Sequence, residues 1–263
     1  MTVVVVKLGG HALDSLAADS PVLADLANDV VALREAGTDV VVVHGGGPQI
    51  AQLLDTAGLE SRFCEGLRIT DVATMAYVAM ALSYVNVRIV AALNHAGLAC
   101  AGLTGADATL ARASSLGAPW DRAGASPAID VRLIESLWRA GVTPVLCSVA
   151  VDGGGDLLNC NADTVAGAVA GATGASSLVL LSDVDQLRSD ADDAQSCLSS
   201  VTMDQVRSMI DDGSARDGMR PKMAAALDAL GAGARRIVVA NGTRRHALRD
   251  ALSLSIPTTE VVR

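Results

Sequence analysis

Short apolar runs alternate along the chain with longer segments in which apolar residues recur at helical spacing. Residues 2–6 and 39–43 are continuous β-branched runs, typical of strands buried on both faces, and residues 22–36 between them have helical spacing. Pro48 follows the second run at a place where the first turn of a helix tolerates proline. The chain therefore begins as strand, helix, strand, helix.

The same alternation continues to the end of the sequence. Further helices are predicted over residues 71–96, with Asp71 as the cap, over 129–140, 203–210 and 222–230, and from about residue 162. Further strands are predicted over residues 98–103, 142–151, 178–182 and 237–240, with a short helix and a Val-Val strand at the end, and a loop or short hairpin over 66–71. Residues 188–196 are polar, lack periodicity and are the best candidate for a mobile surface loop.

This order predicts an α/β fold, a three-layer αβα sandwich around a central, mostly parallel sheet. No linker rich in proline, serine or charge divides the chain, so we expect one continuous sheet shared by two lobes, residues 1–174 and 175–263. Residues 164–182 carry no charge and are long enough to cross a bilayer, but their spacing changes at Gly174 from helical to strand-like. A membrane span is therefore not predicted there.

Composition and charge narrow the function classes. Hydrophobic residues make up 51% of the chain, yet only two Trp, two Tyr and one Phe are present, so aliphatic side chains must fill the core. The 20 Lys and Arg against 29 Asp and Glu give a net charge of -9, which argues against nucleic acid or an anionic membrane as the main partner. The five cysteines form no CxxC pair, which favours neither a disulfide framework nor a zinc site and fits the cytoplasm.

Glycine clusters end the first two predicted strands, and Lys7 stands beside the first cluster. Glycine allows backbone N–H groups to approach a phosphate closely, and a nearby ammonium group adds the cation that a phosphoryl oxygen needs. Neither GxxxxGK[ST] nor a strand-linked GxGxxG occurs, so a P-loop and a dinucleotide-binding unit both lose support.

Six motifs in series resemble the amino-acid-kinase family, and within it the acetylglutamate kinases. They are Lys7-Leu8-Gly9-Gly10, His44-Gly45-Gly46-Gly47-Pro48, Gly66-Leu67-Arg68-Ile69-Thr70-Asp71, Asn159-Cys160-Asn161-Ala162-Asp163, Leu181-Ser182-Asp183-Val184 and Asp217-Gly218-Met219-Arg220-Pro221-Lys222. The resemblance implies transfer of phosphate from ATP, with Mg²⁺, to the side-chain carboxylate of N-acetyl-L-glutamate in arginine biosynthesis. It also assigns the amino-acid substrate and dimerisation to the first lobe and ATP to the second.

The resemblance implies a role for each matching residue. Lys7 and Lys222 would approach the γ-phosphoryl group from the two lobes, with Asp163 organising both, although Asp163 could equally cap the helix that follows it. The remaining roles are phosphoryl contacts for Gly10, Gly45 and Gly46, substrate binding for Arg68, Asn159 and Asn161, and nucleotide binding for Ser182, Asp183, Asp217, Gly218 and Met219.

Three points complete these expectations. A carboxylate acceptor is already ionised at neutral pH, so no general base is needed and we interpret His44 as structural or positional. Asp183 could orient a lysine, bind ribose or cap a loop. Mg²⁺ would come with ATP and be held largely by phosphate oxygens and water, without a dedicated protein cage.

The sequence departs from the family pattern over residues 117–128, where Trp120 lies in a segment that lacks the expected Gly-x-Val-Gly turn. The chain also begins directly on its first strand, so we expect a homodimer through the helix near residues 71–96, without strong arginine feedback. Two alternatives remain. One is a sibling kinase for acetylaminoadipate or for aminoadipate or glutamate linked to a carrier protein, and the other is a ligand-binding regulator of the same fold without turnover.

Overall fold

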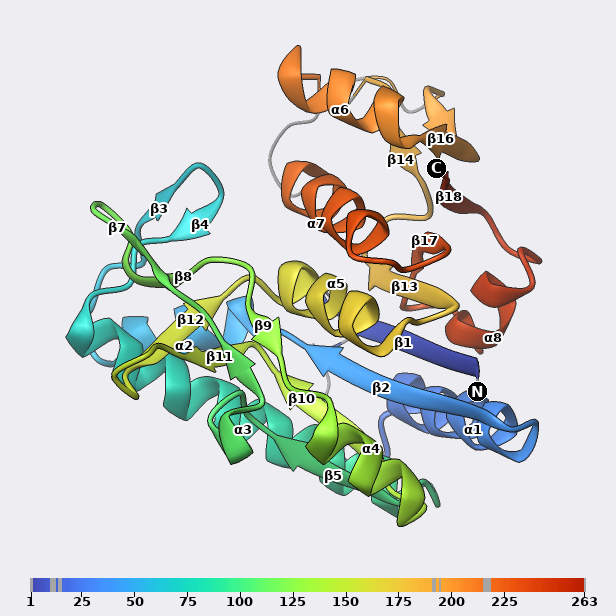
Figure 1. Cartoon of the computed structure of the whole chain (residues 1–263), viewed down its shortest axis with the longest axis horizontal. Coiled ribbons are helices and arrows are strands. Elements are labelled where there is room, and N and C mark those ends of the chain that lie inside the picture. Colours follow the sequence, from blue (N-terminus) through green and yellow to red (C-terminus); the bar gives the residue numbers. More distant parts are fainter. Residues whose placement is uncertain are drawn as a thin grey trace.

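The fold is built on one large sheet, whose strands run across the centre of Figure 1. The computed structural model describes residues 2–9, 13, 16–190, 193, 195–214 and 219–262. The large sheet has eight strands in the order β16 (Ser200–Thr202), β18 (Thr258–Val262), β17 (Ile237–Asn241), β13 (Ser177–Ser182), β1 (Thr2–Leu8), β2 (Thr38–His44), β10 (Thr143–Cys147) and β5 (Cys100–Leu103). All neighbours are parallel except β17 and β18, which confirms a mostly parallel central sheet.

Helices cover both faces of this sheet, as the αβα prediction requires (Figure 1). One face carries α1 (Pro21–Glu35), α3 (Val72–His95) and α8 (Ala247–Leu252). The other face carries α4 (Arg132–Arg139), α5 (Ala162–Thr173), α6 (Met203–Asp211) and α7 (Met219–Gly231). Helix α2 (Gly47–Thr56) packs on α3.

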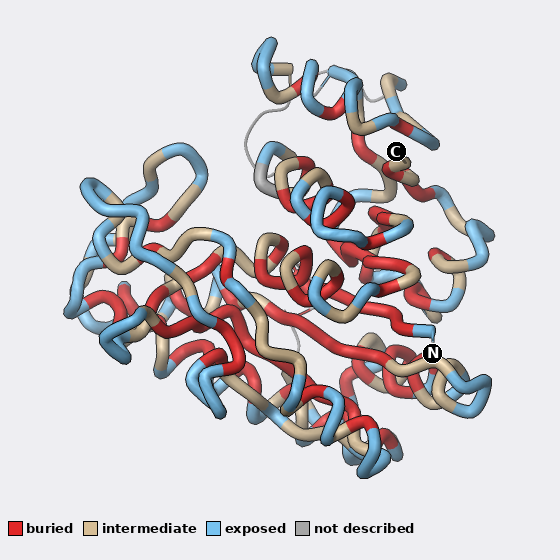
Figure 2. Tube along the Cα trace, viewed as in Figure 1, coloured by how far each residue is buried: buried red, intermediate tan, exposed pale blue. Residues whose placement is uncertain are grey.

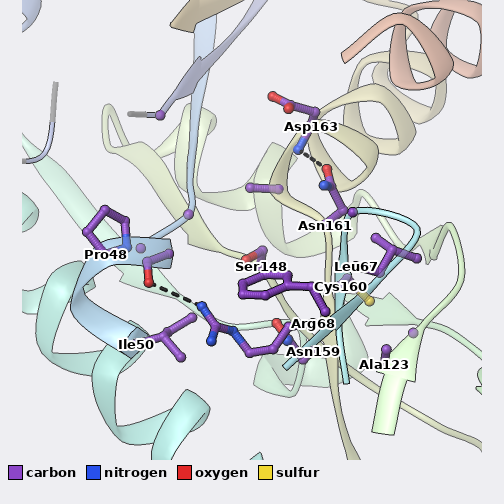
Figure 3. A pocket seen from close by; sticks show the side chains of 18 of the residues that line it. Pro48, Ile50, Leu67, Arg68, Ala123, Ser148, Asn159, Cys160, Asn161 and Asp163 are labelled. Carbon is purple, nitrogen blue, oxygen red and sulfur yellow. Dashed lines mark hydrogen bonds between the residues drawn. The ribbon is translucent and has the colours of Figure 1, made fainter. Parts of the chain in front are cut away.

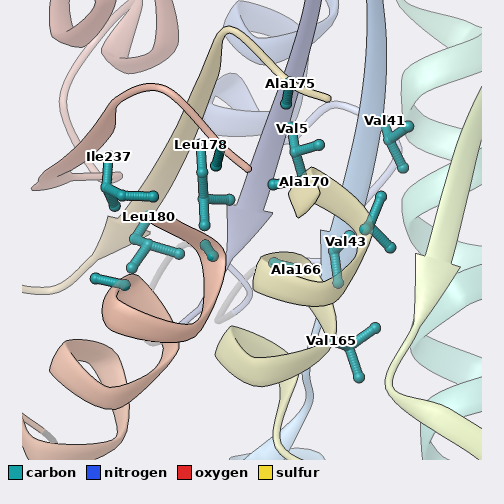
Figure 4. Packing of buried hydrophobic residues seen from close by; sticks show 14 of the residues in the cluster. Val5, Val41, Val43, Val165, Ala166, Ala170, Ala175, Leu178, Leu180 and Ile237 are labelled. Carbon is teal, nitrogen blue, oxygen red and sulfur yellow. The ribbon is translucent and has the colours of Figure 1, made fainter. Parts of the chain in front are cut away.

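The continuous apolar runs are explained by burial on both faces. Along β1, Val3 and Val5 pack against the α5 side, whereas Val4 and Val6 pack against the α1 side, and all four are at most 3% exposed. Figure 2 shows the buried strands as the red centre of the molecule and Figure 4 shows Val5 packed with residues of α5 and β13. A strand without a solvent face needs no polar alternation.

Helices α5 and α7 lie unusually close because glycine faces the contact. A Cβ atom on Gly167 would lie only 2.9 Å from the carbonyl oxygen of Ala225 on α7. Both helices lead into parallel strands of the large sheet, so both begin at its carboxyl edge. Helix α5 ends at Gly174 in the left-handed conformation (φ 61°), which confirms the predicted change from helix to strand at that residue.

A second, six-stranded sheet was not predicted. Its order is β7 (Ser115–Gly117), β8 (Asp121–Gly124), β12 (Leu157–Cys160), β11 (Val149–Val151), β6 (Ala111–Arg112) and β9 (Ala128–Ile129). Two hairpins stand apart, β3 (Phe63–Cys64) with β4 (Leu67–Arg68) and β14 (Leu187–Arg188) with β15 (Cys197–Leu198), and a 3₁₀ turn, η2, covers Asp107–Thr109. The large sheet is the expected continuous one, since it takes strands from both residues 1–174 and residues 175–263, and the second sheet is an addition to it.

Two predicted boundaries were wrong because the chain forms strands of the second sheet there. The strand predicted over residues 142–151 divides at Ser148, where the chain passes from the large sheet into the second one. The helix predicted over residues 129–140 begins at Arg132, because Ile129 instead pairs with Ala111 in β6 and β9. In both places, pairing with a neighbouring strand determines the backbone conformation, although the local sequence pattern predicts different element boundaries.

One helix of the described chain, α3, is long and apolar enough to cross a bilayer by length and composition alone. Of its most apolar window, 44% is buried inside the structure, and a core helix satisfies the same criterion. Asp71 caps α3, as predicted, by accepting a hydrogen bond of 2.7 Å from the backbone N of Thr74.

Candidate active site

The site lies where the order of the large sheet reverses. From β1 the chain continues to β2 on one side, and it returns later to β13 on the other side. Lys7 near the end of β1 therefore stands level with Val43 of β2 and Leu180 of β13. In open α/β sheets such a reversal opens a crevice at the carboxyl ends of the strands, where ligands bind.

A cavity of about 270 Å³ occupies this edge. Its lining comes from residues 45–48, 66–68 and 159–163, together with Lys7, Gly9, Leu13, Ile50, Phe63, Ala123, Gly124 and Ser148. Figure 3 shows Arg68 and Asn159 at one end of it and Asp163 at the other. Four of the six sequence motifs thus reach one cavity, although they are up to about 150 residues apart in the chain.

Lys7 and Asp163 form a buried ion pair at one end of the cavity. Their side chains are 9% and 7% exposed, and Lys7 Nζ lies 2.9 Å from Asp163 Oδ1. The contact is not a well-directed hydrogen bond, and Asp163 Oδ1 has no such bond to any described residue. Gly9 makes room for the ammonium group, since a Cβ atom there would collide with Lys7 Nζ. Because water screens buried charges less, the attraction between these two side chains is stronger than in an ion pair on the surface.

Asn161, not Asp163, caps helix α5. Its side-chain oxygen accepts hydrogen bonds from the backbone N of Asp163 at 2.8 Å and of Thr164 at 3.2 Å. The alternative in which Asp163 serves as the cap is therefore wrong. Because the neighbouring asparagine satisfies the helix amides, the Asp163 carboxylate remains available to Lys7. Figure 3 shows the bond between these two residues.

The glycines after β2 bring the backbone close to the cavity. Gly46 precedes α2, whose first turn has no side-chain cap, so its amides are available to an anion. A Cβ atom on Gly46 would lie 3.0 Å from Leu82 Cδ2 of α3, so a larger residue there would require the leucine side chain to move. The N–H group of Gly45 already donates to Leu8 O over 3.4 Å, a long hydrogen bond. Gly10 lies outside the described residues, so its predicted contact is untested.

Arg68 is a buried cation at the other end of the cavity. The residue is 8% exposed, and its guanidinium donates to Ser61 Oγ and, at 3.3 Å, to Gly47 O. It also lies 4.6 Å from the centre of the Phe63 ring. No acidic side chain pairs with Arg68 in the part of the chain that the structure describes. Burial lowers the pKa of Arg68, but an arginine remains charged and so calls for an anionic ligand.

Asn159 lies beside Arg68, as the motif comparison predicts. Its Nδ2 donates to Thr70 Oγ1 at 3.1 Å, and Thr70 Oγ1 in turn donates to the backbone O of Arg68 at 2.9 Å. Thr70 is fully buried. This short chain of hydrogen bonds ties the strand that carries Asn159 to the hairpin that carries Arg68.

His44 is buried and neutral. Asn86 Nδ2 lies 2.9 Å from His44 Nε2, and His44 Nδ1 lies 2.8 Å from Gly45 O. Asn86 Nδ2 can only donate, so Nε2 accepts and Nδ1 carries the proton. Burial lowers the pKa of His44 to about 4. Both ring nitrogens are used in holding the β2 end, which agrees with a structural role and not with that of a general base.

Two of the residues assigned to the nucleotide, Asp183 and Met219, line a second cavity of about 300 Å³. Lys222 lies in the first turn of α7 and lines it together with Asp183, Arg188 and Met219. Ser182 ends β13 next to it, and its hydroxyl donates to Asp183 Oδ1 at 2.9 Å. Asp217 and Gly218 lie outside the described residues. The structure thus pairs Lys7 with Asp163 in the first cavity and places Lys222 and Asp183 in the lining of the second.

The two cavities share the carboxyl edge of the large sheet. Asp183 follows β13, and β13 is the immediate neighbour of β1, which carries Lys7. Asp163 and Lys222 lie in the first turns of α5 and α7, which pack against each other and begin at that same edge. Convergence of the two lysines on one phosphoryl group stays a prediction.

Sequence reasoning missed three residues around Arg68. Phe63 stacks on its guanidinium, Thr70 bonds its backbone, and Ser148 lines the same cavity. Thr70 lay within a recognised motif, but Ser148 carried no signal of its own. The scarcity of aromatic residues could have drawn attention to Phe63, the only Phe of the chain.

An αβα sandwich that gathers lysines, an arginine and open helix amides at the edge of its sheet defines a class of protein suited to binding anionic small molecules. The comparisons give the family. The sequence pattern of the amino acid kinase family matches residues 2–241, and the chain belongs to that family.

Known relatives agree with this assignment. The acetylglutamate kinase of Symbiobacterium thermophilum is 40% identical over 259 residues, which cover 93% of this chain and 86% of that protein. The structure of N-acetylglutamate synthase from Neisseria gonorrhoeae, complexed with coenzyme A and N-acetyl-glutamate, has a TM-score of 0.82 at 22% identity and covers 100% of this chain and 59% of that one. Carbamate kinase from Giardia lamblia bound to AMP-PNP has a TM-score of 0.66 at 18% identity, covering 99% and 98%. The two structures share the fold.

Proposed function

We propose that this chain transfers the γ-phosphoryl group of ATP to the side-chain carboxylate of N-acetyl-L-glutamate, giving N-acetylglutamyl 5-phosphate and ADP in arginine biosynthesis. The observation that carries the proposal is one cavity with two charged ends. Arg68, buried and held by neutral groups, lies at one end, and the Lys7–Asp163 pair lies at the other. Such a cavity suits a small molecule with two carboxylates, one held and one reacting. Relatives named acetylglutamate kinase at 40% identity support the choice of substrate.

The chemistry needs cations and no base. The substrate carboxylate oxygen attacks the γ-phosphorus, the bond to the oxygen bridging to the β-phosphate breaks, and ADP leaves with that electron pair. Because the acceptor is already ionised, the barrier lies in bringing two anions together and in stabilising charge on the transferring group. Lys7, held by Asp163, would neutralise that charge from the acceptor side. His44, neutral and fully hydrogen-bonded, takes no proton in this scheme.

The other site residues take the following parts in the proposal. Arg68 and Asn159 hold the α-carboxylate end of the substrate, and Asn161 orders the site by capping α5. Backbone N–H groups of Gly10, Gly45 and Gly46 contact the phosphoryl group. Lys222, Ser182, Asp183, Asp217, Gly218 and Met219 serve the nucleotide. Mg²⁺ would arrive with ATP, held mainly by phosphate oxygens and water, and would reduce the negative charge of the phosphates.

The lobes and the assembly belong to the same proposal. Residues 1–174 would bind the amino acid and residues 175–263 the nucleotide, in the cytoplasm. We expect a homodimer through α3, whose Val72, Met80, Tyr84 and Val87 are 64%, 52%, 60% and 64% exposed. A row of exposed apolar side chains on one helix is typical of a protein interface.

Acyl phosphate trapping tests the reaction directly. The chain is incubated with ATP, Mg²⁺ and hydroxylamine, with N-acetylglutamate, glutamate, aspartate or N-acetylaminoadipate as acceptor, and both the hydroxamate and ADP are measured. We expect equal amounts of both products, and the most with N-acetylglutamate. A preference for N-acetylaminoadipate would overturn the substrate assignment, and no product with any acceptor would overturn the proposed activity.

A further inference from the structure

Two hairpins from distant parts of the chain cover the Arg68 end of the cavity. Hairpin β3–β4 contributes Phe63, Leu67 and Arg68, and strand β8 of the β7–β8 hairpin contributes Ala123 and Gly124. The β7–β8 hairpin belongs to the segment in which the sequence departs from the family pattern. Its turn carries Trp120, one of only two tryptophans.

Trp120 joins the two hairpins through its side chain and its backbone. The indole Nε1 donates to Cys64 O at 3.1 Å, on β3. The Trp120 carbonyl accepts from Thr70 N at 3.3 Å, two residues after Arg68. The next residues continue the connection, since Arg122 N donates to Thr70 O at 2.7 Å. Trp120 thus holds the β3–β4 hairpin on both sides of Arg68.

The position of Arg68 depends on this hairpin. Neutral groups hold its guanidinium, namely Ser61 Oγ, Gly47 O and the Phe63 ring. A charged group held only by neutral partners is less firmly fixed than one in a bidentate ion pair. The backbone of β4 must therefore determine where the guanidinium points before an anion arrives.

We propose that Trp120 is a positioning residue for the acidic substrate: it fastens the two hairpins into one cover and thereby preorganises Arg68. The inference rests on the proposed function and adds a residue that acts through Arg68 without reacting itself. Removing the indole N–H lets the β3–β4 hairpin shift, so that binding of the amino acid must first restore its position. The nucleotide cavity is formed by other segments, so the effect falls on one substrate only.

The test compares Trp120→Phe with Trp138→Phe. Trp138 is 8% exposed, and its Nε1 also donates to a backbone carbonyl, that of Val40, but it lies on α4 outside both cavities. We expect Trp120→Phe to raise the KM for N-acetylglutamate by about fivefold, the equivalent of one hydrogen bond, with the KM for ATP and kcat nearly unchanged. Trp138→Phe should leave both KM values at the wild-type level. An unchanged KM for N-acetylglutamate in Trp120→Phe, or equal rises for both substrates, would overturn the proposal.

A second measurement leaves Trp120 in place. In Trp138→Phe, Trp120 is the only tryptophan of the chain. Its fluorescence emission should shift as N-acetylglutamate is added, over the same concentration range as the KM for N-acetylglutamate. Emission that stays constant through saturation would also overturn the proposal. Wild-type ADP release is measured first, so failure of the proposed reaction is seen separately. If another acidic amino acid proves to be the acceptor, the titration uses that one. If none yields ADP, N-acetylglutamate is titrated as a ligand alone, and constant emission overturns the proposal.

Discussion

The buried imidazole of His44 should make the protein less stable in mild acid. Folding removes the ring from water and lowers its pKa from 6.5 to about 4. Between these two values the unfolded chain binds a proton that the folded chain does not. The stabilising contribution of neutral His44 is therefore complete above about pH 6.5, falls as the pH drops through this window, and levels off below about pH 4.

The magnitude follows from the size of the pKa difference. A difference of about 2.5 pH units corresponds to a limiting loss of about 3 kcal/mol, of which about 2 kcal/mol should be lost between about pH 7.5 and pH 5. Native domains are stable by about 5–15 kcal/mol, so a loss of this size is measurable.

Urea unfolding at a series of pH values measures this loss, with His44→Gln as the variant that cannot titrate. Carboxylates contribute to the pH dependence of both proteins, so the informative quantity is the difference between wild type and variant. We expect that difference to shrink by about 2 kcal/mol from pH 7.5 to pH 5. His95→Gln, which changes an exposed histidine on α3, should retain the wild-type dependence. Parallel curves for wild type and His44→Gln would refute the reasoning.

Three further predictions concern the site, the packing and the assembly. Lys7→Ala and Lys222→Ala should each lower kcat by about a hundredfold or more, a loss of a few kcal/mol of transition-state stabilisation, and ADP release at saturating substrates measures it. A lysine whose removal leaves kcat unchanged does not act on the phosphoryl group. Gly167→Ala should cost about 1–3 kcal/mol in urea unfolding, because its Cβ would meet a backbone oxygen of α7 at 2.9 Å. Gly231→Ala enters open space and is the control, so equal unfolding midpoints would contradict the close packing of α5 and α7. Tyr84→Glu should yield a monomer in sedimentation, since its side chain is exposed on the apolar row of α3, and a persistent dimer would place the interface elsewhere.

Much of the large sheet could be predicted because its strands bury both faces. In β1 and β2 every valine has a partner helix on its own side, so the pattern is continuous and easy to recognise. The second sheet could not be predicted in this way. Its strands are two to four residues long, which is too short for an alternation of apolar and polar residues to be recognised. They form because they pair with other strands, as Ala111 does with Ile129.

The site was predictable as a set of motifs but not as an arrangement. Asn161 and Asp163 both stand at a helix start, and a boundary uncertain by two residues leaves either one as the cap. Phe63 and Trp120 act through contacts between two hairpins that are distant in sequence. Such contacts depend on tertiary approach, which a local pattern does not contain.

The arrangement at the start of α5 divides two duties between residues that are close neighbours in the chain. The Asn161 side chain accepts hydrogen bonds from two amides of the first helical turn, while the Asp163 carboxylate contacts the Lys7 ammonium. The electrostatics of the pocket and the scaffold that supports it can therefore vary independently. Asp163→Asn would change the electrostatic field at Lys7 and leave the capped start of α5 in place. Natural variation or design can therefore change the charge of the cavity without unfolding the helix that forms one side of it.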